Sequence, residues 1–416
     1  MAAIVARVKS WVPRFGGLPR EVSVLAAIAF CVALGFGIVI PAIPLFARTF
    51  GVSAFAASAV ISVFAAMRLV SSPAAGWAVN RFGERTIMSS GLAIVGLSSL
   101  AAGFATDYVQ LLVLRGVGGA GSAMFTISAT ALLLRVAPPE FRGRASGLFQ
   151  AGFLIGGVMG PAVGGLVIAI SIRAPFFVYA GTLLAAFLVA ITLLPRLEHV
   201  EAPQLEQDTE PIRFLPTLRL PAYQAALGAN FANGFVFFGL RSSLVPLFVV
   251  EGLRQGPGLA GIGFVVSAGV QAALLTFGGR TADRRGRRPA LVIGLAIGVI
   301  SLAMLAFAPN PAWFLIAMAV AGMSGAFLGP SPTAIVGDVA RGHHGGSVVA
   351  GFQMMSDVGS IFGPLVAGLL LDQSGFPLAF SAGVAVTLLA LGLAVRMPET
   401  LEAKEQEPAP QQEPKE

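Results

Sequence analysis

The segment GRTADRRGRR (residues 279–288) has a counterpart, GWAVNRFGER (residues 76–85), that lies 203 positions earlier in the chain. Because the chain contains 51 glycines, matches between glycines alone could arise by chance. A constant offset that also aligns Arg81 with Arg284, Arg85 with Arg288 and Pro161 with Pro364 is much less easily explained by chance. The sequence therefore predicts two homologous halves. The same offset pairs further residues along the chain: Gln150 with Gln353, Gly156 with Gly359, Gly160-Pro161 with Gly363-Pro364, and Gly165 with Gly368.

Long apolar runs lie on both sides of each copy and fill most of the remaining sequence. Each run is long enough to cross a bilayer core of ~30 Å at a rise of ~1.5 Å per residue. Lipid offers the backbone no hydrogen-bond partners, so such runs are expected to be helices. We therefore expect an all-α integral membrane protein with 12 transmembrane helices, at about residues 22–47, 54–79, 86–105, 108–134, 145–170, 175–195, 222–250, 258–279, 289–308, 311–337, 347–371 and 376–396.

The composition of the whole chain agrees with a protein that lies mostly in lipid. Of the 416 residues, 56% are hydrophobic and only 11% are charged, and the mean hydropathy is +0.83. Ordinary globular domains are ~25% charged. Such a chain cannot cover a water-exposed surface with polar groups, so a soluble enzyme and a disordered protein are both excluded. Its single cysteine, Cys31, excludes a disulfide framework and a cysteine-based metal site.

The lysines and arginines are distributed unevenly between the loops. An even number of spans places both termini on one side, and nearly all basic residues outside the spans fall on that side. The loops of the other side carry only Arg48, Arg173 and Arg254. Because short loops rich in Lys and Arg stay in the cytoplasm, we expect both termini to be cytoplasmic. The net charge of +7 is then a topology signal, and no nucleic-acid partner is expected.

The offset between the two copies also predicts how the halves are related. Because it spans six helices, both halves have the same orientation, as in parallel repeats about an axis along the membrane normal. We expect two six-helix bundles in this pseudo-twofold arrangement, over residues 1–195 and 221–396. The polar, proline-containing residues 196–220 are expected to form a cytoplasmic linker. Residues 397–416, rich in Pro, Glu and Gln, are expected to form a disordered cytoplasmic tail.

The quoted segments resemble the loop between spans 2 and 3 of the major facilitator superfamily, roughly G-x-x-x-D-R-x-G-R-R/K, and the likeness covers residues 20–396. The second copy matches almost completely, whereas the first has Asn80 in place of the usual Asp and Glu84 where a basic residue is common. The resemblance implies a cytoplasmic gate in which the acid lies near the N-terminus of a helix in the other half, where a carboxylate gains ~0.3–1 kcal/mol. Asn80 carries no charge, which suggests a weaker latch in the first half. The expected gate residues are Gly76, Asn80, Arg81, Gly83, Arg85, Gly279, Asp283, Arg284, Gly286, Arg287 and Arg288.

A second pattern resembles the drug:proton antiporter branch of this family. Span 5 contains GGVMGPAVGG (residues 156–165), a full copy of the family's g-x-x-x-G-P-x-x-G-G pattern, which is associated with antiporters rather than sugar symporters. Regularly spaced glycines leave a smooth face for close helix approach, and a proline bends the helix. Tight helix packing without a substrate role is the simpler interpretation, and such packing still serves a moving interface. The residues concerned are Gly156, Gly160, Pro161, Gly164 and Gly165.

Ionisable residues in the middle of the spans are few. Asp357 in span 11 is the only acid near the midplane, and Arg68 in span 2 lies at a similar depth. Each costs at least ~2.5–3.5 kcal/mol there, so it needs a partner or a function. In the family these spans face each other across the two halves, which implies that the two residues can pair in one state and separate in another. Burial favours a neutral carboxyl group and a nearby guanidinium favours the carboxylate, so we hypothesise that Asp357 carries the proton. A permanent ion pair, or an aspartate that caps a neighbouring helix, is the alternative.

Further polar residues inside the spans are candidates for coupling or binding. Arg115 belongs to RGVGGAG (residues 115–121), which resembles the family's R-x-x-Q-G-x-G pattern linked to proton transfer, with Gly118 in place of Gln. It is a proton-coupling candidate together with Asp357 and Arg68, and binding of an anionic substrate is its alternative role. Helix–helix hydrogen bonds explain uncharged polar residues at least as well as a cavity does. The candidates for lining a substrate cavity are Arg241, Asn230, Asn233 and Gln271.

The leading interpretation is secondary active efflux of amphipathic drugs or other small molecules, exchanged for protons by alternating access. The runner-up is a proton-coupled transporter of an anionic metabolite, because intramembrane arginines outnumber acids. An inactive sensor would need a signalling domain, and a membrane enzyme would need a nucleophile–base pair or metal cluster that the spans lack. No metal is expected, because the neighbouring His343 and His344 do not share a helix face. We expect a monomer without a cofactor in the inner or plasma membrane, with a small-molecule substrate, protons and the lipid bilayer as its partners.

Overall fold

The computed structural model describes residues 17–138, 141–194, 214–339 and 346–401. Within these ranges every regular element is a helix, and twelve helical segments are long and apolar enough to cross a membrane. Most of their ends lie within a few residues of the predicted ones. The prediction of an all-α protein with twelve spans is therefore confirmed.

Six spans make up the first half of the chain. The hydrophobic core that they share is drawn from every one of them, which makes this half a single packed bundle. Its helices are α2 (Arg20–Val39) with α3 (Ala42–Arg48), α4 (Ala54–Phe82), α5 (Glu84–Gly103), α6 (Tyr108–Val136), α7 (Arg142–Ile170) and α8 (Ala174–Leu193).

The second half repeats this plan after a short helix, α9 (Phe214–Thr217), which falls inside the predicted linker. Residues 196–213 of that linker lie outside the described residues. The six spans of this half are α10 (Pro221–Asn233) with η2 (Gly234–Leu240), α11 (Arg241–Leu247) and η3 (Phe248–Gly252), then α12 (Gly258–Arg284), α13 (Arg287–Ala306), α14 (Pro311–Leu328) with α15 (Ser331–Val339), α16 (Gly346–Ser374) and α17 (Phe376–Arg396).

Three spans are broken along their length. The first span breaks between α2 and α3 at Ile40-Pro41, and the tenth breaks between α14 and α15 at Gly329-Pro330. Proline lacks the N–H that continues a helix, which explains both positions. The seventh span instead contains two π-helical segments, η2 and η3. Such wide turns occur frequently at functional sites.

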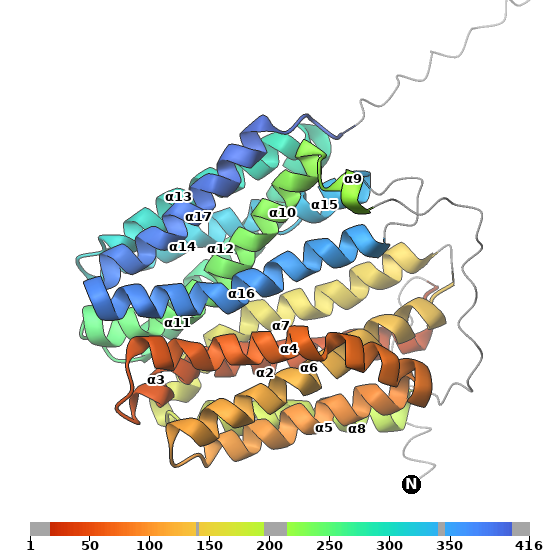
Figure 1. Ribbon diagram of the computed structural model, residues 1–416, viewed down its shortest axis with the longest axis horizontal. Helices are drawn as coiled ribbons and strands as arrows, with labels where there is room; N and C mark the ends of the chain where they lie inside the picture. Colours follow the sequence, from red (N-terminus) through yellow and green to blue (C-terminus); the bar gives the residue numbers. More distant parts are fainter. Residues whose placement is uncertain (1–16, 139–140, 195–213, 340–345, 402–416) are drawn as a thin grey trace, which may run out of the picture.

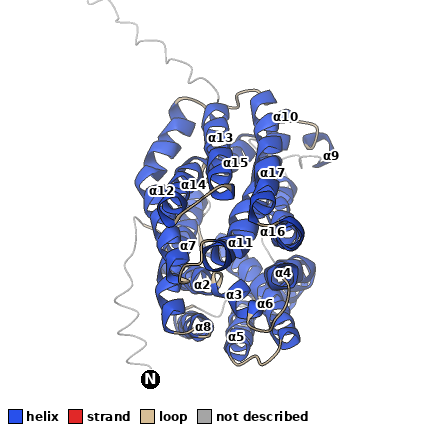
Figure 2. Cartoon of the chain, turned by 90° about the vertical axis from the view of Figure 1, so that its left-hand side faces the viewer, coloured by secondary structure: helices blue, strands red, loops and turns tan. Residues whose placement is uncertain are grey.

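The two bundles lie side by side, and their largest contacts are those of α4 with α16 and of α7 with α12. Figure 2 shows α7 beside α12 and α16 beside α4, and α3 lies against α11 at one end of the molecule. In Figure 1 the bundles converge at the left, near α3 and α11, and diverge toward the right. We call the right-hand end, which carries the α4–α5 and α12–α13 connections and residue 401, the terminal face. The other end, which carries residues 49–53 and 253–257, is the opposite face.

Candidate functional site

An ion pair joins the two bundles in the middle of the membrane-spanning region. Arg68 of α4 contacts the carboxylate of Asp357 of α16 through Nη2 and Oδ1, and the two side chains are 36% and 18% exposed. Closer to the opposite face, the Ser62 hydroxyl donates to the Ile361 carbonyl oxygen at 2.7 Å and connects the same two helices. The structure thus brings together the two mid-span ionisable residues that the sequence singles out.

Arg115 of α6 is buried apart from this pair, with 2% exposure. Its guanidinium carbon lies 4.4 Å from the centroid of the Phe64 ring, a cation–π contact. Among the described residues its Nε has no hydrogen-bond partner. A Cβ atom at Gly118 would lie 2.9 Å from the Ser98 hydroxyl oxygen, so a larger residue at this position would require the Ser98 side chain to move.

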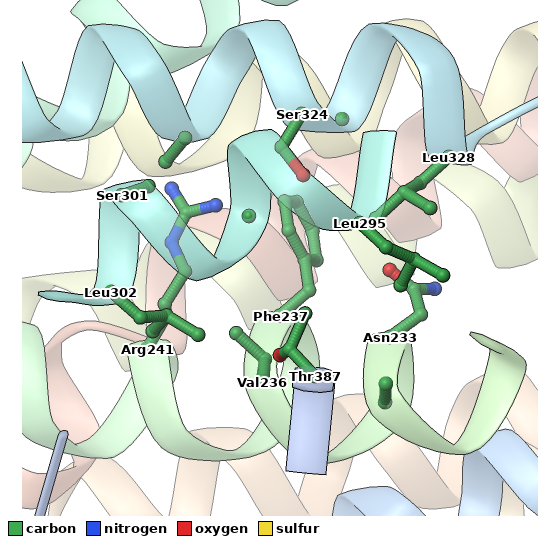
Figure 3. Close-up of a pocket in the computed structure, with 14 residues that line it drawn as sticks. Asn233, Val236, Phe237, Arg241, Leu295, Ser301, Leu302, Ser324, Leu328 and Thr387 are labelled. Carbon is green, nitrogen blue, oxygen red and sulfur yellow. The ribbon is translucent and has the colours of Figure 1, made fainter. Parts of the chain in front are cut away.

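The C-terminal bundle contains a partly open cavity of about 50 Å³ (Figure 3). Its walls come from the seventh, ninth, tenth and twelfth spans, so it lies within one half of the protein. Two of the four predicted cavity residues, Asn233 and Arg241, line it. Its other polar lining residues are Ser301, Ser324 and Thr387. They could not be identified from the sequence, because serine and threonine are common in membrane helices.

The other two predicted cavity residues have different surroundings. The side-chain amide of Asn230 donates to the Phe352 carbonyl oxygen at 2.6 Å and so ties α10 to α16. Gln271 lies behind the cavity wall, where a Cβ atom added to Gly325 would be 3.0 Å from its side-chain amide. The alternative of helix–helix hydrogen bonding therefore describes Asn230, whereas Gln271 borders the wall residue Gly325.

Charged side chains hold the bundles together at the opposite face. Arg48, at the end of α3, makes two bonds of 2.7 and 3.1 Å to the Glu251 carboxylate in η3. The Asp372 carboxylate at the end of α16 accepts from the backbone N–H groups of Ala54 and Phe55, at 2.9 and 2.8 Å. We call these three side chains, Arg48, Glu251 and Asp372, the opposite-face bridge. No sequence pattern pointed to this bridge, although Arg48 and Glu251 are separated by 203 residues, the offset of the repeat.

At the terminal face, the first gate loop is bonded within the N-terminal bundle. Glu84 accepts two bonds of 3.0 Å from Arg135, and Arg85 donates to the Ile191 carbonyl oxygen. The guanidinium of Arg81 lies over the Trp77 and Phe82 rings, at 5.9 and 5.8 Å. Asn80 is exposed, and Gly76 has open space around it. Glu84, which departs from the family pattern, thus has a basic partner in its own half.

The second gate loop is bonded within the C-terminal bundle. Asp283, with a side chain that is 69% exposed, pairs with Arg287 at 2.5 Å, and Arg287 also reaches Asp338 at 3.3 Å. The Glu399 carboxylate accepts from the backbone N–H groups of Arg287 and Arg288, at 2.7 and 3.1 Å, and so caps α13. Glu399 belongs to the predicted tail, most of which (residues 402–416) lies outside the described residues.

Glycine is required at the turn of both gate loops. Gly83 and Gly286 have φ angles of 84° and 117°, which other residues rarely adopt. At Gly286 a Cβ atom would also lie 2.3 Å from a carboxylate oxygen of Glu399. The remaining gate candidates are Gly279, around which a Cβ atom would meet nothing, and Arg284, whose side chain is exposed. With the opposite-face bridge formed and Asp283 bonded inside its own half, this arrangement is closed at the opposite face.

The glycines of span 5 pack in two directions. Cβ atoms at Gly156, Gly160 and Gly164 would come within 2.5–2.6 Å of the α2 backbone, and Pro161 lies against Gly37 of the same helix. Gly165 instead contacts the other bundle, where a Cβ atom would lie 2.1 Å from the Gly261 Cα atom in α12. The pattern therefore provides tight packing within one half and a close contact between the halves.

Comparisons with known proteins agree on one family. The family model described as Major Facilitator Superfamily matches residues 25–256 and 226–415. Multidrug resistance protein 2 of Bacillus subtilis is 26% identical over 379 residues, which cover 88% of this chain and 93% of that protein. Multidrug resistance protein 1 of the same organism is 25% identical over 389 residues, or 92% and 97% of the two chains.

Solved structures show the same fold at low sequence identity. A bacterial homologue of the human lysosomal transporter Spinster, in an inward-facing and occupied conformation, has a TM-score of 0.74 at 18% identity and covers 90% of this chain and 95% of its own. A POT family transporter in complex with 5-aminolevulinic acid has a TM-score of 0.73 at 11% identity, with coverages of 92% and 98%.

Proposed function

The chain belongs to the Major Facilitator Superfamily, and from this premise we propose that it exports amphipathic, drug-like molecules in exchange for protons. The observation that carries the proposal is its similarity, over about nine-tenths of its length, to two proteins named for multidrug resistance. Twelve apolar spans and these bacterial relatives make it a multi-pass protein of the plasma membrane. Parallel six-helix halves of this kind transport by rocking about a site at their interface.

The proton step is assigned to the ion pair between the bundles. While Arg68 is in contact with Asp357, the positive charge stabilises the carboxylate, and the proton has left. When α4 and α16 move apart, the carboxyl group loses this partner in surroundings of low polarity, and the neutral, protonated form is favoured. Arg115 is buried in α6, and its Nε has no hydrogen-bond partner among the described residues; it is the third residue of the proposed coupling set.

The direction of exchange follows from which face is closed when the pair is formed. The present arrangement has the opposite-face bridge in place and the pair intact, so a proton leaving Asp357 exits toward the terminal face. After the bundles rock, Asp357 takes up a proton from the opposite face. Both termini are proposed to be cytoplasmic on the basis of the arginine-rich loops, so each cycle moves a proton inward and substrate outward.

The gate loops are proposed to close the terminal face in the other half of the cycle. Asp283, at the end of α12, is exposed and pairs with Arg287 at the start of α13 at 2.5 Å, so it is available to the other bundle. Asn80, at the equivalent place in the first loop, has no charge to offer. The terminal face would therefore be closed by one charged latch at Asp283 and one neutral latch at Asn80. We propose that the protein completes this cycle as a monomer and without a cofactor.

A second candidate function is the proton-coupled transport of an anionic metabolite. Two intramembrane arginines favour it, because Arg115 and Arg241 are 2% and 5% exposed and neither forms an ion pair with a described carboxylate. Inhibition of transport by organic anions, without protection against cationic dyes, would support this alternative.

The proposal is tested by dye accumulation in cells that express the protein, with and without a protonophore. We expect the wild type to lower the accumulation of a lipophilic cationic dye, and the protonophore to abolish that difference. The Asp357→Asn variant, expressed at the same level, should behave like the wild type with protonophore. Its matched control is Asp107→Asn, because Asp107 caps α6 through the Gln110 N–H and asparagine caps equally well. Undiminished gradient-driven efflux by Asp357→Asn would refute the proton role.

A further inference from the structure

The C-terminal bundle contains a buried positive charge that no described carboxylate neutralises. Arg241 is 5% exposed, and the ion pairs among the described residues do not include it. Its Nη2 donates to the Ser267 hydroxyl oxygen at 3.0 Å, and its Nε has no partner in this part of the chain. Its guanidinium carbon lies 5.0 and 5.9 Å from the ring centroids of Phe237 and Phe264. A buried charge is unfavourable unless it is paired, so these contacts leave the site in need of a negative charge.

The guanidinium borders the cavity of about 50 Å³ described above, and Figure 3 shows it directed into that space. A single water needs ~10–15 Å³ of such space, so the cavity accommodates a small ion. Sites for drug-sized ligands are several times larger, at ~300–1,000 Å³. The cavity is therefore too small for the molecules that the transporter is proposed to export.

The chemistry of the lining selects for an anion. Aspartate and glutamate are absent from the cavity's lining residues, all of which belong to the described part of the chain. Besides Arg241, the polar lining consists of the Asn233 amide and three hydroxyl groups. The Ser324 hydroxyl donates to the Gly294 carbonyl oxygen at 2.8 Å and the Ser301 hydroxyl to that of Ala317 at 3.0 Å. Each hydroxyl has one proton, which can rotate away from the carbonyl oxygen toward a better acceptor, so both groups can donate to an anion in place of these bonds.

Local backbone structure creates the space beside Arg241. The π-helical segment η2 ends at Leu240, so the arginine directly follows the widened turns. On the facing helix, α13, Gly298 has no side chain, and a Cβ atom there would lie 3.0 Å from the Ser324 hydroxyl oxygen. A wide turn on one side and a glycine on the other thus keep the cavity open next to the unpaired Nε.

We propose that this cavity binds a small monovalent inorganic anion of the chloride class as the counter-ion of Arg241. The anion is held by the Arg241 guanidinium together with the hydroxyl groups of Ser301 and Ser324. The site lies wholly within the C-terminal bundle, away from the Arg68–Asp357 pair between the bundles. It therefore goes beyond the proposed efflux function and is independent of it.

The test uses the purified full chain in detergent and chloride as the probe. Thermal unfolding is followed while sodium gluconate is replaced by sodium chloride at constant ionic strength, and radioactive chloride binding is measured in parallel. We expect a saturable rise in Tm and one bound chloride per wild-type chain. Arg241→Gln should lose both responses. Arg254→Gln, which removes a charge from an exposed loop, should retain them.

A second variant keeps the charge and changes only the cavity. Gly298→Ala places a methyl group against the Ser324 hydroxyl and should raise the chloride concentration at half-saturation severalfold. Its control is Gly392→Ala, because Gly392 has open space where the methyl group would lie. This pair decides the question if Arg241→Gln does not fold. A Tm that does not respond to chloride, or a response that persists unchanged in Arg241→Gln and Gly298→Ala, would overturn the proposal and indicate a water-filled cavity. Neither readout depends on dye efflux.

Discussion

The ion pair between Arg48 and Glu251 should determine how readily the bundles separate at the opposite face. The guanidinium makes two bonds to the carboxylate across the two halves, and the side chains are 35% and 33% exposed. Exposed pairs contribute ~0.2–1 kcal/mol, and a two-bond arginine–carboxylate geometry belongs at the upper end of that range. Glu251→Gln should therefore destabilise the closed arrangement by about 1 kcal/mol, which lowers the ratio of closed to open molecules about fivefold.

The change in this ratio can be measured by the distance between two spin labels. Labels at Thr106→Cys and Gly256→Cys, in a Cys31→Ser background, place one probe on each bundle at the opposite face. Glu251→Gln should increase the population with the longer separation, and 1 M salt should have the same effect on the parent, because salt screens exposed pairs. The reversed pair, Arg48→Glu with Glu251→Arg, should restore the parent distribution. The reasoning fails if Glu251→Gln leaves the distances unchanged, or if the reversed pair is as open as the single variant.

Two further perturbations act on contacts between the bundles. Asp372→Ala removes the carboxylate that accepts from the first N–H groups of α4, a loss of ~0.5–2 kcal/mol for a helix cap. The same label pair should show more of the open population. Asp372→Asn keeps one of the two acceptor oxygens, so it should shift the distribution less than Asp372→Ala, and equal distributions for both variants would contradict this role. Gly165→Leu places a side chain where a Cβ atom is already 2.1 Å from the Gly261 Cα atom, so dye efflux should be lost at normal expression. Gly157→Leu, at a position with open space, should still export dye, and efflux by Gly165→Leu would show that this close contact is dispensable.

The number, type and approximate ends of the spans follow from the sequence because lipid imposes a strong constraint on an apolar chain. Breaks within the spans are less predictable. Proline accounts for those at Ile40-Pro41 and Gly329-Pro330, but no residue type marks the π-helical turns that begin at Gly234. That irregularity depends on how α10 and its continuation pack on α16, where a Cβ atom at Gly234 would lie 2.0 Å from the Ser356 carbonyl oxygen. Tertiary contact of this kind is invisible to a pattern of hydrophobicity.

The candidate sites could be predicted from the sequence where a charged residue lies at mid-span, because such charges are unfavourable in the membrane. They could not be predicted near the ends of the spans, where charged residues are common. Arg68 and Asp357 stand out because ionisable residues are rare at mid-span, and their pairing across the halves followed from the family resemblance. Arg48 and Glu251 lie near the ends of their spans, where charges are common, so their partnership gave no comparable signal. The hydroxyl groups around Arg241 were equally hidden, since serine in a membrane helix usually bonds to a carbonyl of its own or a neighbouring helix.

The repeat creates two equivalent interfaces between the bundles, α4 with α16 and α12 with α7, but the proposed proton step uses only the first. The contact of α4 with α16 corresponds, by the offset of 203 residues, to the contact of α12 with α7. Arg68 and Asp357 then correspond to Gln271 and Leu154, which cannot form an ion pair. This second interface instead has the close approach of Gly165 and Gly261, which offers a smooth surface and no charge. A charge that must be exposed and re-buried in each cycle costs energy at every interface that carries one. In the proposed cycle, confining the charge to the α4–α16 interface would couple rocking to a single proton-binding group, and the glycine interface would let the bundles pivot without a second electrostatic barrier.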